Sequence, residues 1–427
     1  MAAIGFSRLP GFRDFPPEDL ALREHIFGAW RSVALRYGFQ EYDGPPLEPL
    51  ELYTEKSGDE IVGQLYAFTD KGDRQVALRP EMTPSLARIL GERSRALPKP
   101  IRWFTMPQLF RYERQQRGRL REHFQWNVDI VGEEGVAADA EVLAVAIDAL
   151  RELGLGAEDF HARVSDRRLL TALLEALGVA AETVPAAFSL IDKIERMPPE
   201  AAREKLRSEV GLDEVGAGRL LALLGEVDPE TLASGFAGEP AVLDALQPVR
   251  DYLAALDAMG LGEFVEMDLT IVRGLAYYTG IVFELFDRKG ELRAICGGGR
   301  YDRLLELVGG EPLPAVGFGM GDVVLGELLA DRGLVPEYRR AVDYFLVPVG
   351  DEQRPAALAL AHRLRERGRR VVYALRSQSV RKQFKAAEVE GARWVLVLGP
   401  DEAARGMVVL RDMTDGTERE VSESELS

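Results

Sequence analysis

A basic segment in the first third of the chain has side chains suited to binding a phosphate. Between Met106 and His123 stand five arginines: Arg111, Arg114, Arg117, Arg119 and Arg121. A guanidinium presents a rigid fork of donors that matches phosphate oxygens. The segment is predicted to run as strand, basic loop and strand, with Gly118 allowing the loop to lie across a polyphosphate. Charge alone fits an exposed hairpin with a basic tip equally well.

Two polar side chains occupy the strand that follows this loop. Gln125 and Asp129 are four residues apart, so both face the same side of an extended strand. The strand is otherwise apolar, which a solvated hairpin explains poorly. The spacing therefore indicates a small polar ligand on this face.

Three further segments combine glycines with polar side chains. Residues 272–280 hold an arginine and two adjacent tyrosines among glycines, which would let the backbone approach a ligand beside phenol hydroxyls. A half-buried strand pair is the ordinary alternative for two tyrosines. Residues 297–302 (GGGRYD) follow an expected strand and read by default as a bulge or turn. Residues 317–322 (GFGMGD) are a weak signal, because they lack the strand–turn–helix position and the later acid of a dinucleotide-binding fingerprint.

The hydrophobic pattern predicts a sheet that is interrupted by helices. Helices are expected at about 20–37 and 139–153, and helical periodicity prevails from about 166 to 259. The alternation predicts an antiparallel-rich sheet whose parts, 1–165 and 261–335, flank a mostly helical insertion at 166–260. Strand-like runs lie at 65–69, 75–79, 101–109, 129–131, 264–272, 281–286 and 292–296.

A separate unit is expected from 341 to 427. Apolar runs at 344–349, 370–374, 394–398 and 407–410 alternate with helical patterns at 355–367 and 380–390. This alternation predicts a small α/β domain with a mixed or parallel sheet. Its segment 361–393 carries ten basic residues against three acidic ones, for which a solvated helix face is the ordinary explanation.

The whole chain has the composition of a folded, water-soluble protein. Its 427 residues include 70 acidic and 53 basic side chains, for a net charge of −17, and 46% are hydrophobic, which excludes intrinsic disorder. No apolar run reaches the ~18 residues that span a bilayer, and no signal peptide is recognisable. The single cysteine, Cys296, and four scattered histidines exclude an internal disulfide and a zinc cage. We expect a cytoplasmic protein without a membrane partner or a dedicated metal site.

Taken together, these segments resemble the class II aminoacyl-tRNA synthetases, and among them the histidyl-tRNA synthetase family. FRYER at 110–114 is similar to the second class motif, and LRPEMTP at 78–84 to the amino-acid-binding turn. Residues 272–278 and 297–302 resemble two histidine-specific motifs, and RKQF at 381–384 with GAR at 391–393 resembles the anticodon-binding domain. The resemblance implies an α+β catalytic domain built on an antiparallel sheet with a helical insertion, plus a C-terminal α/β anticodon-binding domain.

The resemblance also implies a two-step ligase that uses L-histidine, ATP with Mg²⁺, and histidine tRNA, and that forms a homodimer. Histidine and ATP would give histidyl-adenylate and pyrophosphate, and the acyl group would then pass to the terminal ribose of the tRNA. Arg111 and Arg273 would hold the α-phosphate from two sides and stabilise the charge that develops there. Glu113 would read the adenine amino group, and His123 falls at the position of an adenine-stacking phenylalanine.

The same resemblance assigns residues to the amino acid and to the tRNA. Glu81 and Gln125 would bind the α-amino group, with Thr83 lining the turn. Asp129, Tyr277 and Tyr278 would bracket the imidazole, and polar partners of this kind disfavour an apolar rival by ~10⁴-fold or more. The basic residues implied to meet tRNA are Arg363, Arg367, Arg370, Arg376, Arg381, Lys382 and Lys385.

Three departures from the family pattern bear on the site. Ala276 replaces the acid of the usual Gly-Leu-Asp-Tyr-Tyr, and Asp129 is one methylene shorter than the usual Glu. The third class motif normally presents an arginine to the γ-phosphate, and residues 321–325 contain none. Arg119 or Arg121 is our hypothesis for the replacement.

The main alternative is the catalytically silent paralogue that serves as regulatory subunit of ATP phosphoribosyltransferase. It shares the core fold but lacks the anticodon-binding domain, so residues from 341 onward favour the ligase, as does the intact pair Arg111 and Arg273. A general RNA-binding protein would leave both arginine sites unexplained.

Overall fold

The computed structural model divides into two compact units, Met1–Pro336 and Glu337–Ser427, and each is described by itself. The described residues are 7–54, 62–114, 116–225, 227–272, 278–303, 306, 312–338, 340 and 342–426.

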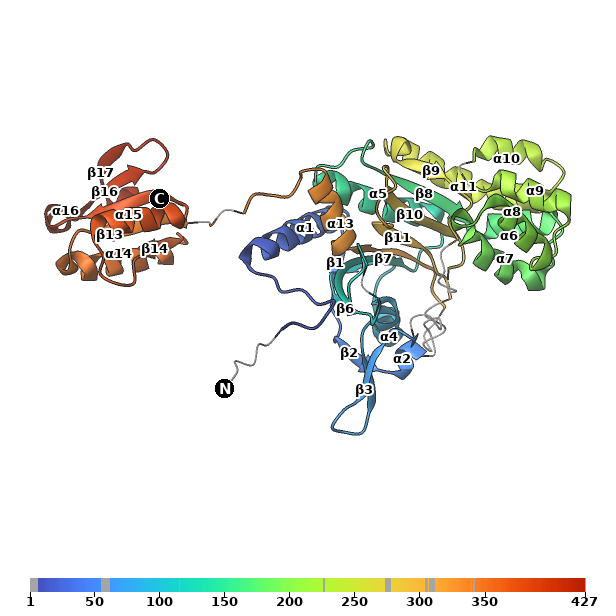
Figure 1. Ribbon diagram of the computed structural model, residues 1–427, viewed down its shortest axis with the longest axis horizontal. Coiled ribbons are helices and arrows are strands. Elements are labelled where there is room, and N and C mark those ends of the chain that lie inside the picture. Colours follow the sequence, from blue (N-terminus) through green and yellow to red (C-terminus); the bar gives the residue numbers. More distant parts are fainter. Residues whose placement is uncertain are drawn as a thin grey trace. The chain divides into compact units, whose positions relative to one another are not determined.

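The first unit is built on a large, mainly antiparallel sheet (Figure 1). The strand order is β1-β5-β7-β12-β11-β10-β8-β9, and β6 lies beside β7. The outer pairs β1–β5 and β8–β9 are parallel, whereas the inner pairs are antiparallel. The strands are Gln40–Glu41 (β1), Ile101–Thr105 (β5), Gln108–Phe110 (β6), Glu122–Val131 (β7), Phe160–Asp166 (β8), Val265–Met267 (β9), Ile281–Asp287 (β10), Cys296–Arg300 (β11) and Ala315–Gly321 (β12).

Several strand boundaries differ from those expected. The run 101–109 is two strands, because Pro107 has no N–H to offer to a sheet ladder. The run 264–272 is cut to three residues, since the Asp268 carboxylate accepts the N–H of Thr270 (2.8 Å) and turns the chain. The strand expected at 292–296 is wrong in its position along the chain: β11 begins at Cys296 and continues through the glycines that were expected to form a turn. The Gly-rich run 317–321 is likewise part of a strand, β12, which leads directly into a helix.

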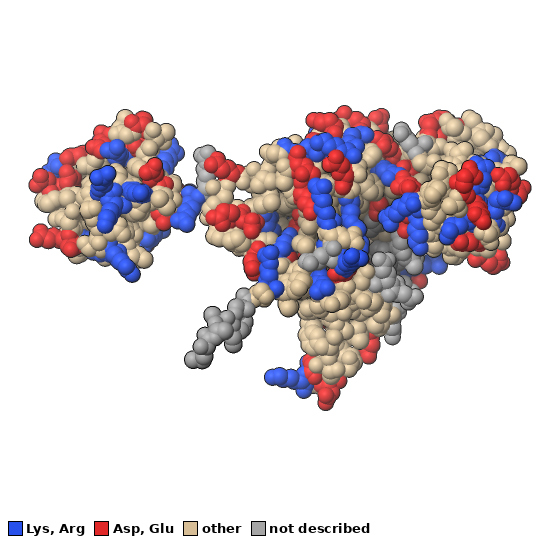
Figure 2. Space-filling view, in the orientation of Figure 1, with Lys and Arg blue, Asp and Glu red and all other residues tan. Residues whose placement is uncertain are grey.

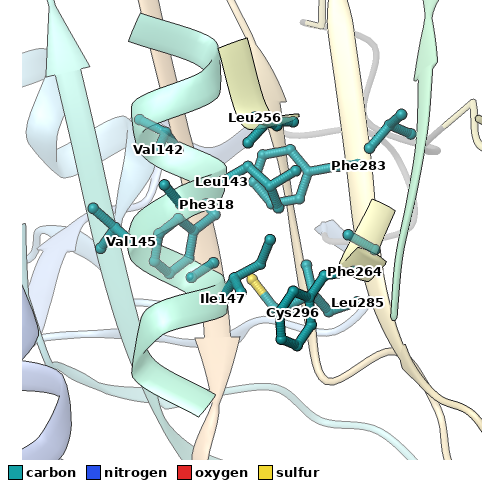
Figure 3. Close-up of a cluster of buried hydrophobic side chains, with 14 of the residues drawn as sticks. Val142, Leu143, Val145, Ile147, Leu256, Phe264, Phe283, Leu285, Cys296 and Phe318 are labelled. Atoms are coloured by element: carbon teal, nitrogen blue, oxygen red, sulfur yellow. The ribbon is translucent and has the colours of Figure 1, made fainter. Parts of the chain in front are cut away.

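One face of this sheet is covered by helices and carries the main hydrophobic core. The helices are α1 (Pro17–Arg36), α5 (Val136–Glu152), α11 (Pro240–Ala258) and α13 (Asp322–Asp331). Alternate residues of the strands point to this face, so that Phe318 of β12 and Phe283 of β10 meet Leu143 of α5 and Leu256 of α11 (Figure 3). Each such fully buried side chain contributes about 1.5–3 kcal/mol relative to an exposed one.

On the opposite face of the sheet, a second apolar cluster forms where α4 packs. Helix α4 (Thr83–Arg93) packs Leu86 and Leu90 against Ile101 and Val131 of the sheet. A small antiparallel sheet and a short helix precede α4: β2 (Leu47–Pro49), α2 (Glu51–Thr54), β3 (Tyr66–Thr69) and β4 (Gln75–Leu78).

A helical segment joins β8 to β9, in the region of the expected insertion. It comprises α6 (Arg167–Ala176), α7 (Val184–Ile191), α8 (Pro199–Ser208), α9 (Glu214–Leu223), α10 (Pro229–Gly235) and α11. Helices α7, α8 and α9 share a separate apolar core that includes Ile191, Leu206 and Leu220. Helices α10 and α11 instead contribute Leu232 and Leu246 to the main core. Part of this helical segment is therefore integral to the first unit.

The second unit is a mixed sheet with helices on both faces. Its strand order is β14-β13-β15-β16-β17, with parallel pairs around β13 and antiparallel pairs from β15 onward. Leu360 of α14 belongs to one core and Ala387 of α15 to another, which places these helices on opposite faces. The elements are Val342–Pro348 (β13), Arg354–Glu366 (α14), Val371–Tyr373 (β14), Val380–Val389 (α15), Ala392–Leu398 (β15), Pro400–Arg405 (α16), Met407–Asp412 (β16) and Glu418–Ser422 (β17). The predicted fold class, an antiparallel catalytic sheet with helices inserted and a C-terminal α/β domain, is confirmed.

Candidate active site

Glycines gather on two adjacent strands, on the face of the sheet opposite to the main core. Gly317 and Gly319 of β12 pair with Asp129 and Asn127 of β7, and Gly299 of β11 pairs with Gly317. Directly opposed residues project to the same face of a sheet, so this face lacks side chains over several residues. Glycine inside a strand weakens the strand and often marks a close approach of a ligand. Gly299, Gly317 and Gly319 thus form a patch of backbone without side chains of its own, which we call the glycine floor.

The two polar residues predicted on β7 lie across this floor. A Cβ atom on Gly319 would stand 2.7 Å from Cδ of Gln125, and one on Gly317 would collide with Oδ1 of Asp129. Both side chains therefore occupy space that the glycines leave open. The prediction that Gln125 and Asp129 share one face is confirmed, and the GFGMG run acquires a structural explanation that sequence alone did not supply.

Asp129 is held in a buried, polar environment. The hydroxyl of Tyr301 donates to its Oδ1, and Tyr301 itself is buried. Burial raises the pKa of Asp129 to about 7, although the hydrogen bond from Tyr301 opposes the shift. In its ionised form, this carboxyl group can accept a hydrogen bond from a substrate N–H. Tyr301 is a site residue that sequence reasoning quoted in GGGRYD without assigning it a role.

Alternation along β11 separates Tyr301 from Arg300. Arg300 points to the opposite side and forms a buried ion pair with Asp139 of α5, with Nε 3.0 Å from Oδ1. It also donates to the backbone oxygen of Glu133 (3.1 Å). This pair fixes the end of β11 on α5, which holds Tyr301 over the glycine floor.

A second aromatic side chain that sequence reasoning missed stands at the other side of Asp129. Tyr42 directly follows β1, and its N–H donates to Phe104 O of β5 (2.9 Å). Its ring packs on Trp103 with centroids 5.3 Å apart, and Trp103 pairs with Asp129 in the sheet. No local sequence signal connects Tyr42 with Asp129, because the two meet only through the order of the strands.

The turn before α4 is joined directly to the phosphate-binding candidate Arg111. Nε of Arg111 donates to the backbone oxygen of Pro80 (2.8 Å), the residue before Glu81. Glu81 is buried, and Thr83 begins α4. Arg79 holds the turn from below by donating to Gly44 O (2.7 Å) and Gln108 O (3.0 Å). The structure thereby brings Arg111 together with the predicted amino-acid-binding turn.

Arg111 also influences His123, which lies on the same face of β7 as Gln125. Burial lowers the pKa of His123 to about 3, and the positive charges of Arg111 and Arg13 lower it further. His123 is therefore a neutral ring at physiological pH. Among the described residues, Arg111 has no carboxylate partner, which leaves its charge available to an anion.

The basic loop is ordered by its own side chains and by α13. Nε of Arg119 lies 2.5 Å from Oε2 of the buried Glu113, and the guanidinium of Arg121 stacks on the ring of Tyr112 at 4.1 Å. At the tip, Gly118, with a φ of +72°, donates its N–H to Glu327 Oε1 of α13 (3.1 Å). The predicted basic loop is thus anchored to α13 through Gly118, while Arg114 and Arg117 stay exposed.

The segment 321–325, which lacks the arginine usual in the third class motif, lies at the start of α13. Asp322 is buried there, accepts the N–H of Phe124 (2.9 Å), and pairs with Arg13 (2.9 Å). A Cβ atom on Gly118 would contact Val324 of α13 at 3.2 Å and Cδ of Arg293 at 3.8 Å. Arg293, which precedes β11, therefore reaches the region that residues 321–325 leave without a cation.

Arg293 is another residue that sequence reasoning missed. Its Nη2 donates to Gln116 Oε1 of the basic loop (2.7 Å), and within the described part of the chain no carboxylate pairs with it. Burial lowers the pKa of Arg293, and the neighbouring charge of Arg119 lowers it further. Arg293 and Arg119 therefore lie near each other, and the Glu113 carboxylate, which pairs with Arg119, partly offsets their charge.

Two predicted residues lie outside the described part of the chain. Arg273 and Tyr277 belong to the segment 273–277, so the common cavity expected for Arg111 and Arg273 stays a prediction. Tyr278 is described: it is buried, and its Cδ1 would lie 3.0 Å from a Cβ on Gly299. Tyr278 therefore borders the glycine floor on the side opposite to Trp103.

In the C-terminal unit, the structure divides the predicted tRNA-binding cations into two groups. Arg363 and Arg367 pair with Glu423 (2.6 and 3.0 Å), and Arg370 pairs with Asp343 (2.8 Å). The other group is exposed and has no carboxylate partner among the residues described: Arg376, Arg381, Lys382 and Lys385. Arg376, Lys382 and Lys385 line one open depression of about 410 Å³ beside α15. Lys and Arg side chains gather over α15 on the face shown in Figure 2.

Two features are absent from the described residues. No group of three or more His, Cys, Asp or Glu side chains within them is arranged to hold a metal ion. No helix in the described ranges has the length and apolar character needed to cross a bilayer.

Comparisons with known proteins agree with this geometry. The family model "Histidyl-tRNA synthetase" matches residues 11–321, and "Anticodon binding domain" matches residues 343–427. A histidine–tRNA ligase of Opitutus terrae is 48% identical over 97% of this chain and 96% of its own length. The chloroplastic/mitochondrial histidine–tRNA ligase of Arabidopsis thaliana is 41% identical over 97% of this chain and 85% of its own. The crystal structure of histidyl-tRNA synthetase from Nostoc sp. PCC 7120 superposes with a TM-score of 0.84 at 26% identity, covering 99% of this chain and 98% of that one. The chain belongs to the histidyl-tRNA synthetase family.

Proposed function

We propose that this protein is a histidine–tRNA ligase, which activates L-histidine with ATP and transfers it to the 3′ end of histidine tRNA. The observation that carries the proposal is that Gln125 and Asp129 share one face of β7 and lie over the glycines of β12, while Arg111 is bonded to the turn that holds Glu81. The regulatory-subunit alternative is not favoured, because the curated relatives named above are ligases and residues 343–427 match an anticodon-binding domain.

The amino acid is proposed to lie along β7. Glu81 and Gln125 bind its α-amino group, with Thr83 beside them, and Asp129, Tyr277 and Tyr278 bind the imidazole. A neutral imidazole has one N–H donor and one acceptor nitrogen, and Asp129 supplies an acceptor. An apolar amino acid would leave these buried polar groups unpaired, which is how such a site rejects a competitor.

Adenylate formation is proposed to depend on two arginines. The carboxylate of histidine attacks the α-phosphorus of ATP, the bond to pyrophosphate breaks, and negative charge spreads over the α-phosphoryl oxygens. Arg111 and Arg273 would hold these oxygens, and their attraction is greatest when that charge is greatest. Because Nε of Arg111 is bonded to Pro80 O, its guanidinium is oriented before ATP binds.

ATP is proposed to lie along the basic loop, with Glu113 on the adenine amino group and His123 beside it. Mg²⁺ would be held by the phosphate oxygens of ATP, as is usual in ATP chemistry. The carboxylate of Glu113 partly neutralises Arg119. The guanidinium of Arg121 is stacked on the ring of Tyr112 and helps to hold the loop. Arg293 therefore joins Arg119 as the candidate for the terminal phosphate, in place of the absent third-motif arginine.

The second step is proposed to need the C-terminal unit for recognition of the tRNA. Arg376, Arg381, Lys382 and Lys385 offer unpaired charge to phosphates, while unstacked bases of an anticodon supply specificity. A homodimer and a cytoplasmic location remain predictions from the resemblance and from the single cysteine, respectively.

The test is histidine-dependent exchange of pyrophosphate into ATP by the purified protein, with the other amino acids as controls, followed by aminoacylation of histidine tRNA. We expect exchange with histidine and not with the controls. Absence of exchange with histidine, or equal exchange with another amino acid, would overturn the proposal.

A further inference from the structure

Arg293 is an exposed cation in the connection between β10 and β11, outside the motifs that carry the family resemblance. Its guanidinium donates to the neutral Oε1 of Gln116 in the basic loop (2.7 Å). No carboxylate among the described residues forms an ion pair with it. Most unpaired arginines on a protein surface are simply solvated, so what matters is how Arg293 is held and what it faces.

The backbone next to Arg293 is fixed by the large sheet. Ile295 is buried, its N–H donates to Leu285 O of β10 (2.8 Å), and its oxygen accepts the N–H of Gly321 at the end of β12 (3.4 Å). The side chain of Arg293 then runs past the tip of the basic loop, where its Cδ would lie 3.8 Å from a Cβ atom on Gly118. The strands that hold the glycine floor therefore also direct Arg293 at the basic loop.

Two arginines of the basic loop are already engaged by the protein. Nε of Arg119 lies 2.5 Å from Oε2 of the buried Glu113. The guanidinium of Arg121 stacks on the ring of Tyr112 at 4.1 Å, and its Nε donates to Glu113 O (3.3 Å). Arg293 is bonded to a neutral amide instead, so among these three guanidiniums it keeps the most charge for an added anion.

The charges around Arg293 favour a polyphosphate. Arg119 of the basic loop and Arg196, which ends the short 3₁₀ turn Ile194–Arg196 of the helical segment, both act on the charge of Arg293. Glu113 acts in the opposite sense and offsets only part of this positive charge. Like charges repel, and an anion placed among them is attracted by all of them. Because Glu113 is the residue proposed for the adenine, the phosphates of the same nucleotide are the anion at hand.

We propose that Arg293 binds the terminal phosphate of ATP, whereas Arg119 and Arg121 order the basic loop. This inference rests on the proposed function and decides between the two arginines named there for this phosphate. A guanidinium can donate two parallel N–H bonds to phosphate oxygens. By holding the terminal phosphate, Arg293 would fix the pyrophosphate part of ATP while the histidine carboxylate attacks the α-phosphorus, and it would stay with the pyrophosphate that leaves.

The test compares two nucleotides that differ only in the terminal phosphate. With α,β-methylene-ATP and α,β-methylene-ADP, the bond that breaks in the reaction is replaced by a carbon bridge, so calorimetry measures binding without turnover. In the presence of Mg²⁺, Arg293→Gln should bind the ATP analogue about 10- to 100-fold more weakly than the wild type, because a hydrogen bond between charged groups is lost. Its affinity for the ADP analogue should stay within about 2-fold of the wild type.

Three control variants separate a phosphate contact from a structural role. Gln116→Ala removes the bond that Arg293 makes in the free protein and keeps the guanidinium. Arg288→Gln removes a cation from the same connection, where Arg288 pairs with Glu266 (2.8 Å). Both should keep the wild-type preference for the ATP analogue. Arg119→Gln should weaken both analogues alike, because its proposed role is to order the loop.

Equal weakening of both analogues in Arg293→Gln, or the same loss in Gln116→Ala, would show that Arg293 only holds the loop and would overturn the inference. Loss of the preference in Arg119→Gln alone would overturn it as well. If Arg293→Gln does not fold, Arg293→Lys answers the question: it keeps the charge without the fork, so weaker binding of the ATP analogue alone supports the inference and unchanged binding rejects it. Exchange assays judge the proposed function separately, since a wild type without histidine-dependent exchange rejects that function whatever the analogues show.

Discussion

Gly319→Ala should impair histidine binding while leaving the fold intact. The added Cβ would stand 2.7 Å from Cδ, 2.8 Å from Nε2 and 2.9 Å from Oε1 of Gln125. Because unstrained heavy atoms approach to about 3.5–4.0 Å, the amide group must move by about 1 Å. The atoms displaced are the far end of a flexible side chain, so the strand is spared. A hydrogen bond lengthened by that amount from its usual ~2.9 Å is effectively lost.

The size of the effect follows from what Gln125 is proposed to bind. A hydrogen bond to a charged group such as an ammonium contributes roughly 1.5–3 kcal/mol, so the KM for histidine should rise about 10- to 100-fold. The KM for ATP should change little. Gly321→Ala is the matched control, because it lies two residues further along β12 and a Cβ there would meet nothing within 4 Å.

The assay is ATP–pyrophosphate exchange at varied histidine, with the melting temperature measured in parallel. An unchanged histidine KM in Gly319→Ala would refute the reasoning that the glycine floor exists to make room for the Gln125 amide. An equal rise in Gly321→Ala would show that any methyl group on this strand is harmful, and would contradict the role given to Gln125.

Two further predictions concern pH and tRNA. The pKa of Asp129 is about 7 in the folded protein against 3.8 ordinarily, so between about pH 4 and 7 the folded state binds more protons than the unfolded state and this group's contribution to stability falls as pH rises. The melting temperature of Asp129→Asn relative to wild type should therefore increase from pH 5 to 8, and a constant difference would contradict the buried carboxyl. In the C-terminal unit, replacing Arg381 and Lys382 by Ala should raise the KM for tRNA about 10-fold without affecting pyrophosphate exchange. The control replaces Arg363 and Arg367, which share an ion pair with Glu423; equal losses in both double variants would reject the distinction between free and paired cations.

Much of the catalytic fold was accessible from the sequence because its signals are local. The period-2 spacing of Gln125 and Asp129 identified one face of β7, and the alternation of apolar runs predicted the C-terminal α/β unit. Motif resemblance then added the order of these segments and the chemistry of the family. These inferences use residues that are neighbours in the chain, for which spacing translates directly into direction.

The rest of the fold and of the site depends on which strands become neighbours in the sheet, and no local sequence pattern predicts that. The default expectation for the glycines of β11 is a bulge or turn, because glycine weakens strands, and only the pairing of β11 with β12, and of β12 with β7, shows why the strands tolerate their glycines. Tyr42 packs on Trp103, which pairs with Asp129 in the sheet. Arg293 lies near Gly118 of the basic loop, which lies against Val324 at the start of α13. Charge runs are equally ambiguous, since the sequence does not show which arginines a distant carboxylate will pair with, as Glu423 does with Arg363.

The most direct test of the account is a crystal structure of the protein with L-histidine bound. The account predicts the imidazole over the glycines of β11 and β12, with one ring nitrogen within hydrogen-bond distance of the Asp129 carboxylate and the α-amino group at Gln125. Histidine bound elsewhere, or in this space with its imidazole turned away from Asp129, would contradict it.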